Sequence, residues 1–482
     1  FADGLIFSML VTHDERHHQI PDLAQAVPTL QNGGISKDGL TLTYHLRHGV
    51  TWHDGAPFTS RDVKFTWQAI MNPRNNVVSR RGYDLVRSMD TPDAYTVVVH
   101  MKQLFPPAVD TLFAESDTPM RVLPAHLLAK YPDLNHVEFN AAPVGTGPFR
   151  FVSWQRGDRI VLQANPAYFR GRPALKQMTL AIIPDDNTVQ AQLKSGEADL
   201  AIEIPSAVYR GVDGAPGVRR QLADSPAYTA ILFNTQRPPL DDARVRQALV
   251  LGVDRAAIVR DDEYGTATLA TADLAPYYWA FDSTLHPAPY DPARAKALLD
   301  AAGWRAGPDG VRVRNGTRLS LLMVYGIGSQ IVRTMTAQVQ QMYRGIGVDL
   351  QFKGFDYATL YAAAQSGGIL NGGKFDLAMY SWVSGSDPDD SSQWTCAMIP
   401  PAGNNVSRYC SPAMEAAQRL ALSTFDRSVR KRAYAQIQSL LLRDAPAAFL
   451  YYQSLRYARV PDLQYFLPNG ISEGWNAQDW RR

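Results

Sequence analysis

FDLAMYSWVSGSDPDDSSQWTCAMIPPAGNNVSRYC, which occupies residues 375–410, is the most informative stretch of this chain. Its first part, Phe375 to Trp382, is an apolar run of the length of a buried strand. The run ends in SGSDPDD, residues 384–390, where five hydroxyl or carboxyl side chains and a proline are typical of a turn. Open α/β sheets build ligand sites at the carboxyl ends of their strands. The stretch therefore predicts a site that combines acidic and aromatic groups.

The two cysteines of the chain, Cys396 and Cys410, follow this acidic turn and are 14 positions apart. A Pro-Pro-Ala-Gly turn lies between them, which suits a disulfide that fixes a loop. Two buried free thiols are the alternative. Two cysteines are too few for the usual cysteine-based zinc site. We predict a Cys396–Cys410 disulfide, which favours an oxidising compartment.

Several motifs of this stretch occur together in one known family. They are a Gly-x-Phe-Asp run that begins at Gly373, the tryptophan at 382, the Asp-Pro-Asp of residues 387–389 and the Asn-x-Ser-x-Tyr of residues 405–409. In this order they resemble the family 5 extracellular solute-binding proteins, which are the dipeptide, oligopeptide and nickel receptors of ABC importers.

The resemblance extends over nearly the whole chain. Residues 21–24, 37–50, 53–59 and 62–63 are similar to the N-terminal signature of that family, which is long and ordered and therefore specific. The blocks PVGTGPF at 143–149, NPAYFRG at 165–171 and LKSGEADL at 193–200 match further family motifs. The glycine-rich 143–149 block is not a phosphate loop, because no Lys-Ser or Lys-Thr follows it.

Composition excludes several classes of protein. The chain has 482 residues, of which 45% are hydrophobic and 20% charged, so it can bury large cores and is not disordered. Its net charge of +2 gives no broad cationic field, which argues against nucleic-acid binding. No stretch approaches the roughly 18 apolar residues of a membrane helix.

The sequence begins at Phe1, without a methionine or a signal peptide. In the family that the chain resembles, the first lobe begins with a strand upstream of this point. We therefore expect the sequence to be a processed or shortened form, from which a signal peptide has been removed.

Local patterns predict alternating helices and strands. In the N-terminal part, residues 41–46 alternate as a half-buried strand, and Thr59 caps a helix that buries Val63, Trp67 and Ile70. Further along, helices are expected after Asp241 or Asp242, after Asp291, over residues 330–344 and from about Val429 to Leu441. Val348, Leu350 and Phe352 predict one strand, and residues 447–452 predict another. Such alternation indicates an α/β fold.

The resemblance implies an α/β, two-lobed periplasmic-binding-protein-like fold of type II, in its three-domain cluster, with a ligand cleft between the lobes. We assign residues 1–15, 174–236 and 451–482 to the first lobe, residues 16–173 to an inserted subdomain of it, and residues 237–450 to the second lobe. The chain would then cross between the lobes near Gln236 and near Tyr451. Two crossings allow one lobe to rotate against the other, and a ligand stabilises the closed form by its higher affinity for that form.

Enzyme and metal motifs are absent from the sequence. It contains no Gly-x-Ser-x-Gly, no His-Glu-x-x-His and no P-loop. Four pairs of adjacent aspartates are better explained as helix or turn caps than as catalytic dyads. His13 and His17 would share a face of a helix as metal ligands, but the segment is predicted as a strand end and loop, which favours solvated histidines.

We therefore predict a receptor that is not an enzyme. It would lie in the periplasm or outside the cell as a lipoprotein, act as a monomer without cofactor or resident metal, and deliver a peptide to a membrane ABC permease complex. The alternatives are a receptor for a nickel chelate, opine or oligosaccharide, and a secreted hydrolase.

The largest cleft is expected between the lobes and to be lined by aromatic side chains, because tryptophan offers a flat surface at low entropy cost. The residues predicted to bind the substrate are Trp382, Ser384, Asp387, Trp394, Tyr325 and Asn404. Burial of the indoles in the core is the alternative.

Asp387 has two possible roles. Peptide-binding members of the family place an aspartate three positions after the tryptophan that matches Trp382, where this chain has Gly385. Asp387 is the nearest replacement and would bind the peptide ammonium through a charge-assisted bond. The alternative is that Asp387 only shapes the Asp-Pro turn.

Overall fold

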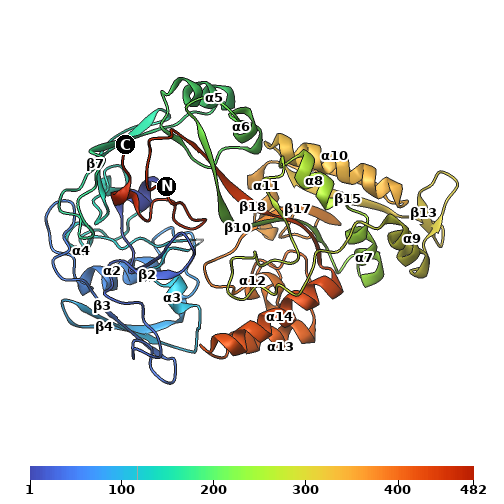
Figure 1. Ribbon diagram of the computed structural model, residues 1–482. Helices are drawn as coiled ribbons and strands as arrows, with labels where there is room; N and C mark the ends of the chain where they lie inside the picture. The colour runs from blue at the N-terminus through green and yellow to red at the C-terminus, as the bar shows by residue number, and fades with distance from the viewer. Residues whose placement is uncertain (117) are drawn as a thin grey trace.

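The computed structural model describes residues 1–116 and 118–482, which form two lobes joined by long strands (Figure 1). Both chain ends lie in the first lobe, at the left of Figure 1. The second lobe is a sheet covered by helices on both faces, and a small three-stranded sheet extends from its far end. The α/β architecture and the two lobes agree with the predicted fold class.

The N-terminal subdomain surrounds one core. Its elements are β1 (Val11–His13), β2 (Gln19–Pro21), β3 (Thr41–His45), α2 (Ser60–Met71), β4 (Val86–Asp93), β5 (Thr96–Met101), α3 (Ala108–Thr111) and α4 (Ala125–Leu128), while the preceding helix α1 (Ala2–Ile6) packs on the first-lobe core. The sheet order is β3-β5-β4. The side chains of Leu42 and Tyr44 on β3 are fully buried, as the alternation predicts. Helix α2 begins with a capping box between Thr59 and Asp62, which confirms its predicted start.

The rest of the first lobe packs around the chain ends. It contains β6 (Phe149–Gln155), β7 (Arg159–Ala164), β8 (Gln177–Ala181), α5 (Asp186–Ser195), β9 (Leu200–Ala201) and α6 (Ser206–Gly211). Phe149 and Leu162 share a core with Tyr457 and Trp480. Strands β6 and β7, within the range 16–173 that the sequence assigned to the inserted subdomain, pack on the first-lobe core, whereas Phe169 packs against the subdomain core.

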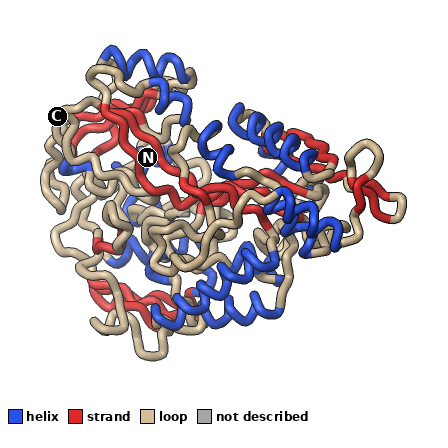
Figure 2. The backbone as a smooth tube through the Cα atoms, turned by 45° about the vertical axis from the view of Figure 1, so that its right-hand side comes forward, coloured by secondary structure: helices blue, strands red, loops and turns tan. Residues whose placement is uncertain are grey.

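Two long antiparallel strands, β10 (Arg219–Phe233) and β18 (Ala447–Arg459), connect the lobes (Figure 2). Their pairing shifts register between Asp224 and Tyr228. Ala223 packs against the first-lobe core, whereas Tyr228 lies in the second-lobe core. The chain therefore crosses at this irregularity, before the predicted position at Gln236. The sequence predicts the crossing too late because the turn after Gln236 is marked by prolines, whereas a bulge inside a strand has no such local signal.

The second lobe places helices on both faces of one sheet. Its elements are α7 (Ala243–Leu251), α8 (Arg255–Asp261), β11 (Thr268–Leu269), α9 (Pro292–Ala301), β12 (Arg305–Ala306), β13 (Arg312–Arg314), β14 (Thr317–Arg318), β15 (Ser320–Gly326), α10 (Gln330–Gly345), β16 (Asp349–Phe355), α11 (Tyr357–Tyr361), β17 (Leu377–Val383), α12 (Ser391–Trp394), α13 (Pro412–Ala421) and α14 (Arg427–Asp444). Helices α7, α9 and α10 pack on one face, and α13 and α14 pack on the other.

Most helix predictions for this lobe are confirmed, including the caps of α7 by Asp242 and of α9 by Asp291. One strand prediction is only partly right. Leu350 is buried on β16, but Phe352 is 40% exposed. The order β11-β18-β10-β17-β15-β16 makes β16 an edge strand, so part of it lacks a covering layer.

Candidate functional site

A pocket with a volume of about 240 Å³ lies between the lobes. Its wall in the second lobe comes from the end of β17 and the segment that follows it. Its wall in the first lobe comes from residues 78–81, from α3 with its flank, and from residues 116 and 118. Hydroxyl and amide side chains dominate the lining: Ser79, Thr111, Ser116, Thr118, Ser386, Ser392 and Asn404. Three carboxylates and one arginine also reach the pocket: Asp110, Asp387, Asp389 and Arg81.

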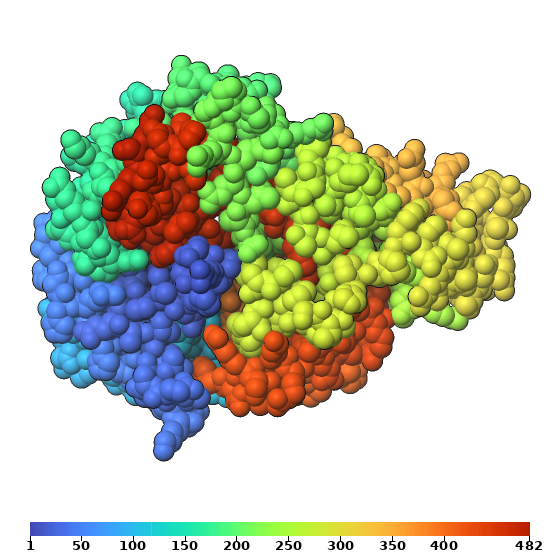
Figure 3. Space-filling view, in the orientation of Figure 1, coloured from blue at the N-terminus to red at the C-terminus, as the bar shows by residue number. Residues whose placement is uncertain are grey.

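The lobes are closed on each other around this pocket. Figure 3 shows the blue N-terminal subdomain directly against the orange helical part of the second lobe. Phe425, between α13 and α14, packs against the subdomain core, and a Cβ on Gly39 would meet its ring at 2.8 Å. His17 stacks on Tyr277 of the second lobe with ring centroids 4.0 Å apart.

Closure explains why the pocket between the lobes is small. A larger, open pocket of about 580 Å³ lies on the N-terminal subdomain, beside α2, and is lined by Asn75, Met120 and Asn135 among others. The prediction that the largest cleft lies between the lobes is therefore wrong for this closed structure. The prediction of an aromatic lining is also wrong, because Trp382 is the one aromatic side chain in the described lining.

The predicted substrate-binding residues separate into two groups. Trp382, Asp387 and Asn404 line the pocket between the lobes. Ser384 is outside this lining, and its backbone N–H donates to the carbonyl of Pro226 at the lobe crossing, at 3.0 Å.

Tyr325 and Trp394 are core residues here. Tyr325 packs in the core on the α7–α10 face of the sheet, so its predicted place in the cleft is wrong for this structure. Trp394 is only 1% exposed, and its indole N–H donates to Asp273 Oδ2 at 2.8 Å. The prediction that Trp394 lines the cleft is likewise corrected, because α12 turns this side chain away from the pocket and onto the core.

Asp387 is held by the second lobe itself. Its Oδ1 accepts a hydrogen bond from Arg430 Nη2 on α14 at 2.5 Å, and both side chains are almost fully buried. The same oxygen accepts the backbone N–H of Asp389 at 3.1 Å, which is the predicted turn-shaping bond. Burial raises the pKa of Asp387 to about 6, and attraction to Arg430 opposes this rise.

Asp389 forms an ion pair across the closed lobes. Its partner is the guanidinium of Arg81 in the N-terminal subdomain. Beside it, Ser386 Oγ donates to the backbone carbonyl of Glu115 at 2.9 Å, which is a second bond between the lobes. The acidic turn therefore contacts the opposite lobe through two of its side chains.

Asp110 is the carboxylate that the first lobe contributes to the pocket. Gln19 Nε2 donates to its Oδ1 at 2.6 Å, and His13 Nε2 lies 3.2 Å from the same oxygen. Sequence reasoning missed this half of the site, because its residues come from separate segments of the first lobe and no contiguous motif marks them.

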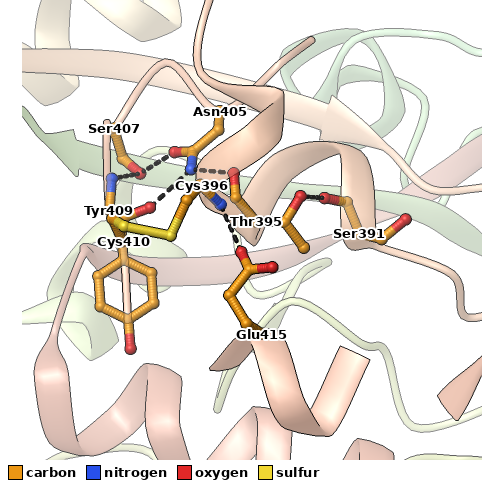
Figure 4. Close-up of a disulfide and its surroundings, with 8 residues drawn as sticks. All are labelled: Ser391, Thr395, Cys396, Asn405, Ser407, Tyr409, Cys410 and Glu415. Atoms are coloured by element: carbon orange, nitrogen blue, oxygen red, sulfur yellow. Dashed lines mark hydrogen bonds between the residues drawn. A yellow bond between two sulfur atoms is a disulfide. The ribbon is translucent and has the colours of Figure 1, made fainter. Parts of the chain in front are cut away.

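The disulfide Cys396–Cys410 is present, which confirms the prediction (Figure 4). The loop that it closes is also fixed by polar contacts, since Asn405 Nδ2 donates to the carbonyls of Thr395 and Tyr409 at 2.9 and 2.7 Å. Asn404, in the same loop, lines the pocket. The disulfide therefore stabilises one part of the pocket wall.

Within residues 1–116 and 118–482, no three histidine, cysteine or acidic side chains are grouped so that they could hold a metal ion. His13 contacts Asp110 while His17 stacks on Tyr277, so these two residues do not form the pair of metal ligands that helical spacing would give. No helix among these residues has the length and apolar character needed to cross a bilayer.

Comparison with known proteins gives one consistent result. The family model of the bacterial extracellular solute-binding proteins, family 5, matches residues 18–398. The oligopeptide-binding protein AppA of Bacillus subtilis is 26% identical over 99% of this chain and 86% of its own length. A putative ABC transporter peptide-binding protein of Brucella ovis is 30% identical over 89% of this chain and 78% of its own length.

Solved structures of similar proteins share the fold. NikZ of Campylobacter jejuni, in complex with Ni(L-His), has a TM-score of 0.83 and 27% identity, and the match covers 99% of this chain and 94% of NikZ. AppA of Bacillus subtilis, in complex with a nonapeptide, has a TM-score of 0.81 and 24% identity, with 99% and 93% covered.

Proposed function

The chain belongs to the family 5 bacterial extracellular solute-binding proteins, and from this membership we propose that it captures a peptide and delivers it to an ABC permease complex. Two similar chains, from Bacillus subtilis and Brucella ovis, carry names that state peptide binding. The single observation that best supports the proposal is the pocket between the lobes, whose lining comes from both of them.

A pocket of this kind acts through closure. A ligand that contacts both Trp382 and the first-lobe segments binds the closed form more tightly than the open one. Binding therefore shifts the population towards closure by the difference between the two affinities. The permease would recognise the closed arrangement of the two lobes, and no step of this mechanism makes or breaks a covalent bond.

We further propose that the receptor works as a monomer in the periplasm, or outside the cell as a lipoprotein. The disulfide supports an oxidising compartment, since reducing compartments keep such cysteines as thiols. The volume of about 240 Å³ supports a short peptide, because pockets for drug-sized ligands are typically about 300–1,000 Å³.

Native mass spectrometry of protein purified without refolding tests the proposal. We expect an adduct with the mass of a short peptide, and a rise in melting temperature when that peptide is added back. Unchanged peptide after prolonged incubation would distinguish the receptor from a secreted hydrolase. An adduct with the mass of an oligosaccharide or an opine would contradict peptide binding and leave the receptor class intact.

A nickel chelate is the second candidate, and the likeness to NikZ favours it. A chelate that brings its own ligands needs few from the protein. The same purified protein should then bind Ni(L-His) in titration calorimetry, with no comparable signal from the nickel ion or from histidine alone.

A further inference from the structure

The pocket between the lobes has three carboxylates, and two of them already have a cationic partner. Asp387 pairs with Arg430 from behind, within its own lobe. Asp389 pairs with Arg81 across the lobes. A carboxylate that is paired and buried in this way gains little from a ligand ammonium, because its charge is already compensated.

Asp110 differs from both. Its Oδ1 is close to Gln19 Nε2, which carries no charge, and to the imidazole of His13. An amide donor orients a carboxylate without cancelling its charge, whereas the guanidinium partners of Asp387 and Asp389 are permanently charged. The contacts from Gln19 and His13 both involve Oδ1, so they fix the plane of the carboxylate and leave Oδ2 for another donor. The side chain of Asp110 is 15% exposed and lines the pocket.

The two donors are held rigidly. His13 on β1 and Gln19 on β2 are directly opposite each other in the antiparallel pairing of these strands. The His13 side chain is itself buried. A fixed pair of donors gives Asp110 one orientation before any ligand binds, which lowers the entropy cost of binding.

Asp110 also lies near Asp387 across the pocket, since its negative charge contributes to the rise in the pKa of Asp387. A cation between the lobes would therefore lie close to the Asp110 carboxylate, whose contacts described above, with Gln19 and His13, involve no guanidinium or ammonium group.

We propose that Asp110, and not Asp387, receives the ammonium group of the bound ligand through Oδ2, with Gln19 and His13 as positioning residues. This inference rests on the proposed peptide function and assigns its specificity to the first lobe. A ligand amine would then be fixed to the N-terminal subdomain, while Trp382 and the acidic turn close over the rest of the ligand.

Calorimetric titration with trialanine and with N-acetyl-trialanine tests the assignment. We expect the unmodified protein to bind trialanine about 30-fold or more tightly than the acetylated form, which is typical of losing one partner of a desolvated charge pair. Asp110→Asn should remove this preference. The matched control is Asp90→Asn, which alters another aspartate–histidine contact of the same subdomain, to His100 at 3.0 Å, outside the pocket. It should keep the preference.

The outcomes separate the two hypotheses. If the protein binds trialanine and Asp110→Asn keeps the preference for the free amine, or if Asp387→Asn alone removes it, the assignment to Asp110 is overturned and peptide binding stands. If the unmodified protein binds neither probe, both proposals fail. If Asp110→Asn proves unfolded in a melting experiment, the comparison between the unmodified protein and Asp387→Asn still tests the assignment. A preference for trialanine that Asp387→Asn retains supports Asp110, and a preference that Asp387→Asn loses contradicts it.

Discussion

Asp387 Oδ1 and Arg430 Nη2 lie 2.5 Å apart inside the second lobe, with side chains that are only 6% and 5% exposed. The guanidinium also lies over the ring of Trp279, 5.2 Å from its centroid. This pair supplies internally the cation that a ligand would otherwise bring to the acidic turn. It explains how a carboxylate can line the pocket without being its anchor.

Arg430→Met should destabilise the protein strongly, by about 3–5 kcal/mol at pH 8, because it leaves a buried carboxylate without a partner. The pKa of Asp387 is already raised to about 6, above that of an unfolded chain, so stability falls as pH rises through this value. Without Arg430 the pKa should rise further, and the loss should be smaller at pH 5. Urea unfolding at both pH values measures this. Equal losses would contradict it, and Asp387→Asn with Arg430→Met should restore part of the stability.

Asp273 and Asp390 form a second buried acidic pair, in which Asp273 Oδ2 accepts from the indole of Trp394 and Asp390 Oδ1 accepts from Gln418. Burial raises the pKa of both, and their mutual repulsion adds to the rise for Asp390. The folded state thus binds a proton that the unfolded state releases, and stability is lost as pH rises. Asp390→Asn should reduce this loss by on the order of 1 kcal/mol. Thermal unfolding from pH 5 to pH 9 checks it, and a parallel pH dependence in both proteins would refute it.

The two indoles that the sequence treated alike should behave differently. Trp382→Phe should weaken ligand binding by roughly two- to tenfold and leave stability nearly unchanged, since Trp382 lines the pocket and is only partly buried. Trp394→Phe should instead cost about 1–3 kcal/mol of stability, because it removes the hydrogen bond to buried Asp273. Chemical denaturation and calorimetry on both variants test the contrast. A loss of affinity only in Trp394→Phe would reverse the assignment.

The Phe425 contact should stabilise the closed form. Phe425→Ser removes an aromatic side chain that packs against the N-terminal subdomain and is not part of the pocket lining described above. We expect the affinity for every ligand to fall by the same factor, about tenfold, because the Phe425 contact forms on closure and touches no ligand. Small-angle X-ray scattering should show a larger radius of gyration for the variant. Ligand-dependent losses would assign Phe425 to recognition instead.

The disulfide should contribute to stability but not to selectivity. Replacing both Cys396 and Cys410 by serine should cost roughly 3 kcal/mol in the chain-entropy model for a loop of this size. Melting of the double variant measures the cost, and the ranking of ligands should stay the same. Thiol titration of unfolded, unreduced parent protein should find no free thiol.

The sequence by itself determined what local patterns encode. The start of α2, the alternation along β3 and the cap of α9 each depend on residues a few positions apart, so spacing alone predicts them. The disulfide was predictable because the chain has only two cysteines. The family was recognisable because its motifs keep their order along the chain.

Only the tertiary structure decided which side chains meet. Asp387 and Arg430 are 43 positions apart, and Asp389 and Arg81 are 308 apart, so no local spacing marks either pair. Trp382 and Trp394 lie in one stretch of sequence, yet one lines the pocket and the other fills the core, because α12 directs the second onto the sheet. The first-lobe half of the site depends on how the two lobes close on each other. Closure depends on contacts between residues that are far apart in the sequence, so no single segment predicts it.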